Sequence, residues 1–450
     1  MKDNNLKKVN TDLKPKVKIL ICLLVTLIIK PVYATNLQEI YQLALENDAQ
    51  YKQVVAANLA TQEQKPQAIS QLLPNVSLSA GTQNVNATSS GGFGFGGETD
   101  TNAHNYNFSL NQPVFRWDRY LQLRQAAAVI EQSNAQLLAA QQNLIVRVAD
   151  AYFNVLAAMD TLTFAQAEKL SLSRQLDQTN QRFEVGLTAI TDVQEAKAGY
   201  DRAVASEIVA ENNVDNTRES LGEIIGDYVM EFAFLQEEIP LVHPDPDSID
   251  DWTTTALEQN LDILAGMHAV EAARQQVKIQ RSGHLPTLDL QASKSFQYNS
   301  GGRFGANKSK SENIGVQLTV PMFQGGLVNS RTRQAVHQLD QELEKLVQAR
   351  RASQRSTRQS YLGVISGISQ VEALKQAVVS SETALEAIQA GYEVGTRTAV
   401  DVIGAERNLS QNKRDYARAR YDYLINTMRL KQAAGILSAD DVANINNLLN

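Results

Sequence analysis

FEVGLTAITDV at residues 183–193 and YEVGTRTAVDV at residues 392–402 are two versions of one segment, placed 209 positions apart. In each version a long helical pattern breaks at Val-Gly and resumes near an aspartate, Asp192 or Asp401. Glycine permits the left-handed turn that such a break needs. Thr and Asp suit the start of a helix, because their side chains accept bonds from free backbone N–H groups. The segment therefore predicts, twice in the chain, a long helix that breaks at a tip and a second helix that returns.

The rest of the chain repeats with nearly the same spacing. Landmarks recur at offsets of 208 to 212 positions: Leu73-Pro74 with Leu285-Pro286, Pro113 with Pro321, Tyr152 with Tyr361, and Gly226 with Gly435. Residues that end or interrupt helices and recur at a nearly constant offset indicate an internal structural repeat. We therefore expect a first repeat over residues 35–240 and a second over residues 241–450.

The helices of each repeat follow from periodicity and from proline. A helix of about 30 residues opens each repeat, near 37–72 and near 254–284, and ends before a proline that favours extended backbone. A long helix near 116–184 carries apolar residues at the seven-residue spacing of a coiled coil. At ~1.5 Å per residue this helix is about 100 Å long. A shorter helix near 192–225 returns beside it, and the second repeat contains the same pair.

A pair of strands separates the helices of each repeat, over residues 76–112 and 287–321. Apolar and polar residues alternate there with the period of a half-buried strand. Polar loops are expected at 84–105 and 299–312. No later stretch offers 18 consecutive apolar residues, so any part of the mature chain that crosses a membrane must consist of strands.

The number of strands decides how such a chain can enter a membrane. Four strands cannot close a barrel, for which about eight are the practical minimum. Three chains would supply twelve. The predicted fold class is therefore mainly α with a β-barrel portion: a trimeric, 12-stranded outer-membrane barrel that continues as a long α-helical coiled-coil tunnel.

The N-terminus is predicted to direct secretion. Six lysines precede an apolar run at 19–29, and the small residues Val32 and Ala34 occupy the two positions that a signal peptidase reads. This pattern is typical of a secretory signal peptide at 1–34, with a membrane anchor as the alternative. Cys22 is the one cysteine of the chain, so the acidic mature chain contains none, as suits a protein of a bacterial envelope.

Composition excludes several functional classes. The chain of 450 residues has a formal net charge of −7 and no basic stripe, which argues against nucleic-acid binding. One cysteine cannot form a disulfide framework. The five histidines are scattered, no HExxH motif occurs, and no nucleophile lies beside a base. We therefore expect no catalytic residues, no metal site and no cofactor; the protein is not expected to be an enzyme.

The chain resembles the TolC family of outer-membrane channels. The resemblance covers residues 36–450, and its most specific segments are 39–51, 73–80, 183–194, 283–290 and 391–401. It implies an exit duct of tripartite efflux pumps and type I secretion, located in the outer membrane and extending into the periplasm. It also implies a homotrimer that contacts outer-membrane lipid and a periplasmic membrane-fusion adaptor. Through the adaptor the duct would work with an inner-membrane transporter of the RND or ABC class.

The resemblance places a gate at the helix tips. It implies that Asp192 bonds Tyr392 and that Thr191 bonds Arg397, which would hold the second coiled coil inward at rest. The alternative is that these residues only cap helices and form an exposed charge pair, which contributes about 0–1 kcal/mol. In a trimer each link would occur three times, so that small energies add up to a reversible latch.

Two further roles at the tips follow from the resemblance. Asp401 would contribute to a ring of three carboxylates at the constriction, and such rings favour cations. The family has a second aspartate one helical turn later, where this chain has Gly404, so a weaker acidic ring is expected. Gly186 and Gly395 would form the docking surface for the adaptor, although each also suits a simple turn.

Other segments complete the prediction. Residues 237–251, which contain three prolines, and residues 437–449 are expected to form a collar around the helical tunnel. The glycine-rich residues 91–97 are expected to form an extracellular loop. Four aromatic residues at the strand–helix junctions predict either an interfacial belt or local packing: Phe115, Trp117, Tyr120 and Phe323.

Two other classes share parts of this pattern. A trimeric coiled-coil surface adhesin also pools four strands per chain, but its strands lie together at the C-terminus rather than in two internal pairs. A soluble periplasmic adaptor or scaffold would need neither alternating strands nor polar loops. The outer-membrane duct accounts for more of the sequence than either alternative.

Overall fold

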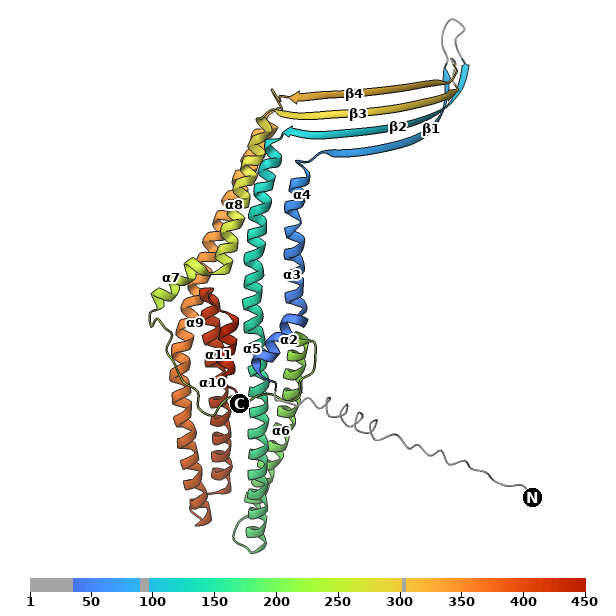
Figure 1. The fold of residues 1–450 in the computed structure, drawn as a ribbon. Coiled ribbons are helices and arrows are strands. Elements are labelled where there is room, and N and C mark those ends of the chain that lie inside the picture. Colours follow the sequence, from blue (N-terminus) through green and yellow to red (C-terminus); the bar gives the residue numbers. More distant parts are fainter. Residues whose placement is uncertain (1–34, 90–96, 302–304) are drawn as a thin grey trace, which may run out of the picture.

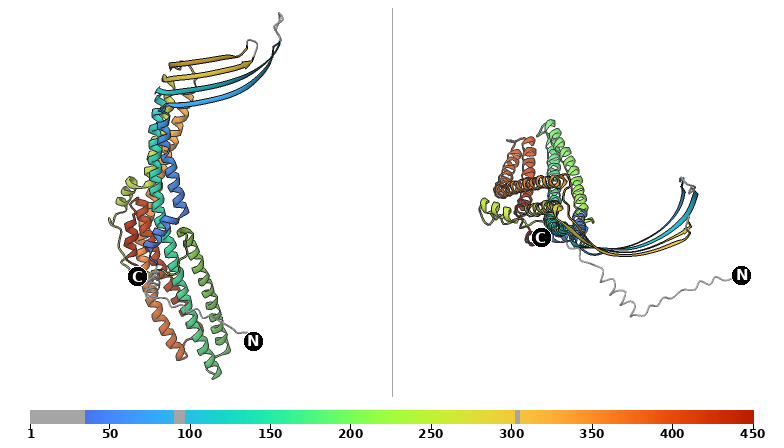
Figure 2. Two further views of the ribbon diagram at one scale, coloured as in Figure 1. Left: turned by 45° about the vertical axis from the view of Figure 1, so that its right-hand side comes forward. Right: turned by 90° about the horizontal axis from the view of Figure 1, so that it is seen from above.

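The computed structural model describes residues 35–89, 97–301 and 305–450, which form a long rod of helices with a sheet at one end (Figure 1). Viewed from above, the sheet extends from the rod as an arc (Figure 2). The predicted signal peptide, residues 1–34, lies outside the described residues. Within those described ranges, no helix is both long enough and apolar enough to cross a bilayer.

The sheet combines strands from both repeats. Strands β1 (Asn75–Ser89) and β2 (Gly97–Phe115) belong to the first repeat, and β3 (Thr287–Gly301) and β4 (Asn307–Thr319) to the second. All neighbours are antiparallel, in the order β1-β2-β3-β4. Each predicted strand pair is thus a hairpin, and pairing of β2 with β3 joins the hairpins into one four-stranded sheet.

The strands are longer than the sequence predicted. β1 continues to Ser89 and β2 begins at Gly97, so most of the predicted loop 84–105 is strand. In the second hairpin β3 reaches Gly301 and β4 begins at Asn307, within the predicted loop 299–312. The loop assignments were wrong because these outer parts are mainly polar, and the apolar row through Val76 does not continue into them: Val85 and Ala87 lie on the opposite face. Residues 90–96 and 302–304 lie outside the described part of the chain.

The two faces of the sheet differ in chemistry near the helices. One row of directly paired residues crosses all four strands on the apolar face: Val76, Leu110, Ala292 and Ile314. The next row, on the opposite face, is polar: Ser77, Ser109, Ser293 and Asn313. Successive side chains of a strand point to opposite faces, so one face suits lipid and the other suits water.

The helices account for most of the chain. The first repeat contains α2 (Leu37–Asn47), α3 (Ala49–Gln62), α4 (Gln64–Ser70), α5 (Trp117–Glu184) and α6 (Ile190–Ile225). The second contains α7 (Ile249–Gln259), α8 (Leu261–Arg281), the 3-10 turn η1 (Ser282–His284), α9 (Leu327–Glu393), α10 (Ala399–Ala434) and α11 (Ala439–Asn446). The long and returning helices agree with the prediction to within a few residues.

The opening helix of each repeat is not continuous, which corrects the prediction of one helix of about 30 residues. Asp48 separates α2 from α3 with φ −60° and ψ 116°, and Asn260 separates α7 from α8 with φ −62° and ψ 127°. Each residue ends one helix and caps the next with its side-chain oxygen. No glycine or proline marks these breaks, because a short polar side chain provides the cap instead.

Each break in an opening helix contacts the end of a returning helix. α6 ends at Gly226 (φ 71°), against Asn47, and α10 ends at Gly435 (φ 82°), against the break at Asn260. The Asn260 side chain donates a hydrogen bond to the carbonyl oxygen of Ala433 at 3.0 Å. A Cβ atom at Gly435 would lie 2.3 Å from the Gln259 carbonyl oxygen, so this close approach requires glycine.

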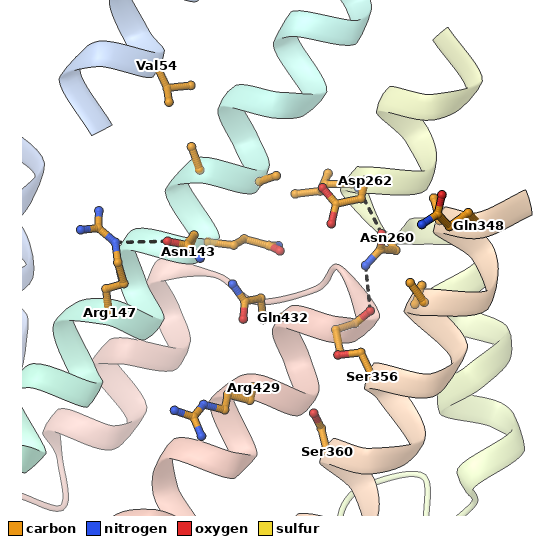
Figure 3. Close-up of a pocket in the computed structure, with 18 of the residues that line it drawn as sticks. Val54, Asn143, Arg147, Asn260, Asp262, Gln348, Ser356, Ser360, Arg429 and Gln432 are labelled. Carbon is orange, nitrogen blue, oxygen red and sulfur yellow. Dashed lines mark hydrogen bonds between the residues drawn. The ribbon is translucent and has the colours of Figure 1, made fainter. Parts of the chain in front are cut away.

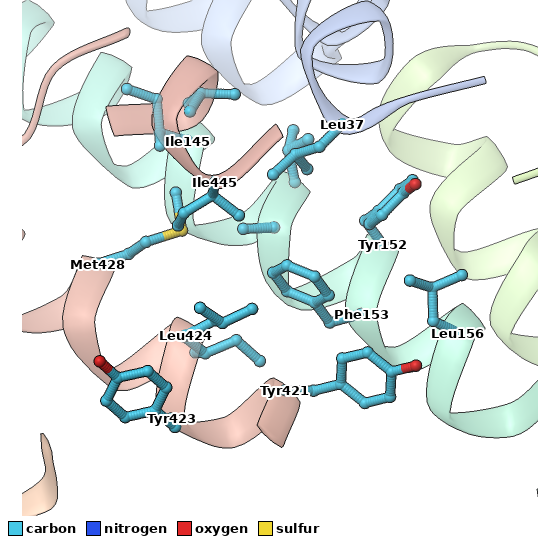
Figure 4. Close-up of a cluster of buried hydrophobic side chains, with 14 of the residues drawn as sticks. Leu37, Ile145, Tyr152, Phe153, Leu156, Tyr421, Tyr423, Leu424, Met428 and Ile445 are labelled. Carbon is cyan, nitrogen blue, oxygen red and sulfur yellow. The ribbon is translucent and has the colours of Figure 1, made fainter. Parts of the chain in front are cut away.

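The largest hydrophobic core lies part-way along the rod, where α5 and α10 meet α2 and α11 (Figure 4). The rings of Phe153 and Tyr421 stack there with centroids 5.6 Å apart. The Tyr152 hydroxyl donates to the carbonyl oxygen of Ala233 at 2.7 Å. Core residues of α5 include Leu144, which belongs to the predicted heptad stripe, so this stripe holds helices together.

Beside this core, the end of the predicted collar segment 437–449 meets the residues just before the other collar segment, 237–251. The backbone N–H of Asn450 donates to the carbonyl oxygen of Phe234 at 2.9 Å, and Leu235 forms an antiparallel bridge with Leu449. α7 and α11 flank the long helices part-way along the rod (Figure 1). That these segments encircle an assembled tunnel remains a prediction.

Candidate functional site

The first helix tip is a glycine turn between α5 and α6. Gly186 has φ 78°, and the N–H of Leu187 donates to the carbonyl oxygen of Arg182 at 2.8 Å. α6 begins at Ile190, two residues before the predicted start at Asp192. Among the described residues, no side chain caps this helix, since Ala189 occupies the N-cap position.

The predicted gate residues of this tip lie in the first turn of α6. The hydroxyl of Thr188 donates to the carboxylate of Asp192 across the turn. A negative charge there interacts favourably with the N-terminal end of the helix dipole. In the described chain Asp192 is therefore bound locally, and Thr191 has no side-chain hydrogen bond.

The second helix tip has the same turn with a complete cap. Gly395 has φ 80° and Thr398 occupies the N-cap of α10. The carboxylate of Asp401 accepts from the Thr398 N–H at 2.9 Å and from the Thr398 hydroxyl at 3.0 Å. These hydrogen bonds, the backbone one first, hold the pKa of Asp401 below its ordinary value. Asp401 is therefore a firmly ionised carboxylate at the start of α10.

Tyr392 joins the second tip to the first long helix. Its side chain is only 6% exposed, and its hydroxyl lies 3.2 Å from the hydroxyl of Thr179 on α5. The guanidinium of Arg182 lies over the Tyr392 ring, 4.7 Å from its centroid, and donates to the Tyr392 carbonyl oxygen at 3.3 Å. We call Thr179, Arg182 and Tyr392 the tip clasp, because they connect α5 to the end of α9.

The tip clasp differs from the expected pairs. Within the described residues of one chain, Tyr392 contacts Thr179 and Arg182 rather than Asp192, and the Arg397 side chain makes no hydrogen bond. The sequence offered one signal for Thr179. It occupies the next seven-residue position after the buried Leu172, where a hydroxyl replaces the apolar side chain of a coiled-coil stripe. The gate roles of Thr191, Asp192, Tyr392 and Arg397 remain predictions.

Both tips carry exposed apolar side chains. Val185 and Leu187 are 69% and 70% exposed, and Val394 at the second tip is 76% exposed. They flank Gly186 and Gly395, beside which a Cβ atom would meet nothing within 4 Å. Gly404, one turn after Asp401, also faces open space.

A hollow of about 800 Å³ with a mixed polar and apolar lining lies where α10 ends and α8 begins (Figure 3). Arg147, Asn260, Ser356 and Arg429 line it. Arg147 forms a 2.9 Å ion pair with the buried Asp48, and Arg429 forms a 3.1 Å pair with Asp150. In the described ranges no cluster of three histidine, cysteine or acidic side chains could hold a metal ion.

Comparisons with known proteins agree with this geometry. The model of the outer membrane efflux protein family matches residues 40–227 and again residues 252–436. The outer membrane protein TolC of Escherichia coli (strain K12) is 38% identical over 92% of this chain and 85% of TolC. The alkaline protease secretion protein AprF of Pseudomonas aeruginosa is 29% identical over 91% of this chain and 86% of AprF.

A solved structure has the same fold. The Campylobacter jejuni CmeC outer membrane channel aligns with a TM-score of 0.77 at 18% identity, over 93% of this chain and 90% of CmeC. The predicted fold class and internal duplication are thereby confirmed. The surface-adhesin and periplasmic-scaffold alternatives lose their support. The two matches to one family model, one in each repeat, show that this chain belongs to the outer membrane efflux protein family.

Proposed function

We propose that three copies of this chain form a gated, passive exit duct through the outer membrane. The duct serves tripartite efflux or type I secretion and extends into the periplasm. Its two repeats, 35–240 and 241–450, each supply one strand hairpin and one coiled-coil pair. The family is one of channels, and our proposal includes no catalytic step.

The observation that best supports the duct is the difference between the two faces of the sheet, one apolar and one polar. The apolar row through Leu110 suits lipid, and the row through Ser109 suits a water-filled lumen. Edge strands β1 and β4 expose unpaired backbone groups that lipid cannot satisfy. Pairing β4 of one chain with β1 of the next would satisfy them and close twelve strands. The long helices α5 and α9, at ~1.5 Å per residue, would continue the lumen for about 100 Å.

The gate is proposed to lie at the tips. In our proposal the α9–α10 hairpin stays inward while the tip clasp holds Tyr392 against α5, and it moves outward when the clasp breaks. Thr191, Asp192 and Arg397 would add links at rest. Asp401 would supply one carboxylate of a ring of three, which its cap leaves ionised, and Gly404 would leave the next turn without charge.

The exposed tips are proposed to bind a periplasmic membrane-fusion adaptor, which connects the duct to an inner-membrane RND or ABC transporter. Val185, Leu187 and Val394 would supply the apolar contact, and Gly186 and Gly395 would allow close approach of the adaptor backbone. Energy and cargo selection would belong to the inner-membrane partner.

Single-channel recording of the purified protein in a planar bilayer tests the duct and the gate. We expect small, stable steps from the wild type and larger steps from Arg397→Ser and from Thr179→Val. Thr383→Val, an exposed site on α9, is the matched control and should behave as wild type. A trivalent cation should block Asp401→Ala less than wild type. Large, equal steps from all variants would refute the gate, and the absence of any steps when adaptor is supplied would refute the duct.

A further inference from the structure

The apolar face of the sheet carries an unexpected group of charges. Lys294, Lys308, Lys310 and Glu312 lie on that face of β3 and β4, in register with the aliphatic row through Ile314. The Glu312 carboxylate contacts Lys294 Nζ at 2.7 Å and Lys310 Nζ at 3.3 Å. We call these four residues the outer basic cluster. Its three lysines and one glutamate leave two positive charges in excess on each chain.

The register of β3 and β4 shows where the cluster begins. Three successive pairs on this face are aliphatic: Leu288 with Leu318, Leu290 with Val316, and Ala292 with Ile314. The next three are charged or aromatic: Lys294 with Glu312, Phe296 with Lys310, and Tyr298 with Lys308. The face therefore changes from aliphatic to basic and aromatic within one step of the pleat.

The outer end of this region, the pair Tyr298 and Lys308, lies at the outer edge of the lipid-facing band. The change itself begins six residues from Leu288, about 15 Å up the same band. Leu288, near the helices, and Tyr298 are ten residues apart, ~33 Å along a strand. Strands tilted by about 40° rise about 25 Å over that length, the height of the apolar band of outer-membrane barrels. Since the helices extend into the periplasm, Tyr298 and Lys308 lie at the boundary with the outer leaflet.

Aromatic rings surround the lysines at this boundary. Lys308 Nζ lies 5.5 Å from the centroid of the Tyr298 ring. His104 stacks on Tyr298 at 6.1 Å, and Tyr106 packs against Phe296 at 6.4 Å. Aromatic side chains of this kind are typical of a membrane interface, and long lysine stems reach along apolar surface towards a polar layer.

The neighbouring chain does not supply the missing negative charge. In the closed barrel β4 would pair with β1 of the next chain, and the sequence of β1, residues 75–89, contains no charged residue. Lysines that face lipid are costly unless they lie near an interface with an anion. Asp100 and Glu98 share this face of β2 but lie at least four residues beyond His104, the partner of Tyr298, ~13 Å further along the strand. The groups that can contact and neutralise the lysines are therefore the headgroups of lipids in the outer leaflet.

We propose that the outer basic cluster binds a phosphorylated lipid of the outer leaflet, one on each chain. Lys308 and Lys310 would contact phosphate, for which Glu312 competes through its ion pairs with Lys294 and Lys310. The rings of Phe296 and Tyr298 would lie along the lipid below its headgroup. This inference goes beyond the duct and its gate, and it requires only that the sheet forms part of an outer-membrane barrel.

Native mass spectrometry of the purified trimer with added lipid A tests the site. Wild type should retain up to three lipid A molecules, whereas Lys308→Gln/Lys310→Gln should bind about 30-fold more weakly, at about fivefold for each lysine. Glu312→Gln should bind more tightly than wild type, because a competing carboxylate is removed. A loss of folding cannot produce that gain.

The controls distinguish binding of lipid A at this site from nonspecific attraction to lysines and from binding of free phosphate. Lys52→Gln/Lys197→Gln removes two exposed lysines from α3 and α6 and should bind lipid A as wild type. Dephosphorylated lipid A should bind wild type as weakly as lipid A binds the double variant, and millimolar inorganic phosphate should displace little lipid A. Equal binding of both lipids, equal binding by Lys308→Gln/Lys310→Gln and wild type, or displacement by phosphate would overturn the proposal. Binding is read without current measurement, so a failed gate leaves this test intact.

Discussion

The two repeats use one backbone plan with different side-chain chemistry. At the breaks of the opening helices, Asp48 forms an ion pair with Arg147, whereas Asn260 binds the carbonyl oxygen of Ala433. At the tips the glycine turns match, with φ 78° and 80°, but α10 has a complete cap and α6 has none among the described residues. Duplication thus preserved the turns, while the side chains that hold them diverged.

The two repeats also differ in how closely the end of the returning helix packs against the break in the opening helix. A Cβ atom at Gly435 would lie 2.3 Å from a backbone oxygen, whereas one at Gly226 would lie 3.1 Å from the Asn47 side chain. The second junction is therefore the less tolerant of the two. Variants at equivalent positions can measure this difference.

Alanine at the two junction glycines should give the largest effect. Gly435→Ala should lower the free energy of unfolding by about 3–4 kcal/mol, because it adds a backbone clash to left-handed strain. Gly226→Ala should cost about 1–2 kcal/mol, mainly from strain. Denaturation of the purified protein followed by circular dichroism would measure both. Equal losses would contradict the difference between the junctions.

Removing the charge at the first break should give the next largest effect. Asp48→Asn leaves Arg147 without its buried partner and should cost about 2 kcal/mol at neutral pH. Burial acts to raise the pKa of Asp48, but hydrogen bonds from Arg147 and from the Tyr51 N–H outweigh it and hold that pKa below 3.8. This contribution is present above pH ~4 and is lost as the pH falls through the lowered pKa.

The pH dependence provides the check on this ion pair. The stability difference between wild type and Asp48→Asn should shrink as the pH is lowered from 6 towards about 3. Asn260→Gln, at the uncharged break of the second repeat, is the control, and its cost should not change over this range. A stability difference between wild type and Asp48→Asn that stays constant over this pH range would contradict the role of the charge.

The caps of the two tips should give the smallest effects, in opposite directions. Thr398→Ala removes the cap of α10 and should cost about 1 kcal/mol, whereas Ala189→Ser adds a cap to α6 and should stabilise it by about 0.5 kcal/mol. Hydrogen exchange of the first-turn amides would report each change locally. Faster exchange in α10 and slower exchange in α6 are expected. Unchanged rates at both tips would show that the caps are not what distinguishes them.

The sequence predicted those parts of the fold that local patterns determine. The Val-Gly breaks, the heptad stripe through Leu144 and the two strand hairpins follow from the spacing of apolar residues and from the glycines and prolines that end helices. The breaks at Asp48 and Asn260 were missed, because their caps depend on polar side chains that also occur inside helices. The outer strand halves were missed because they are mainly polar.

The site was predicted less completely than the fold. The sequence predicted both tips and a role for Tyr392 on α9. It did not predict the partners of Tyr392, Thr179 and Arg182, which belong to the other long helix, α5. Only the packing of α5 against the end of α9 brings them together, across more than 200 residues of sequence. The outer basic cluster likewise depends on strand register, which decides that Lys294, Lys310 and Glu312 share a face.

The most direct test of the account is to lock the tip clasp and measure current. Residues 35–450 contain no cysteine, so in a protein of these residues Thr179→Cys/Tyr392→Cys can be cross-linked cleanly with a short bis-maleimide. Before cross-linking, single-channel steps should be larger than in wild type, because the hydroxyl contact is lost. After cross-linking, the steps should fall to the wild-type size. Large steps that persist after complete cross-linking would contradict a gate held by α5 and Tyr392.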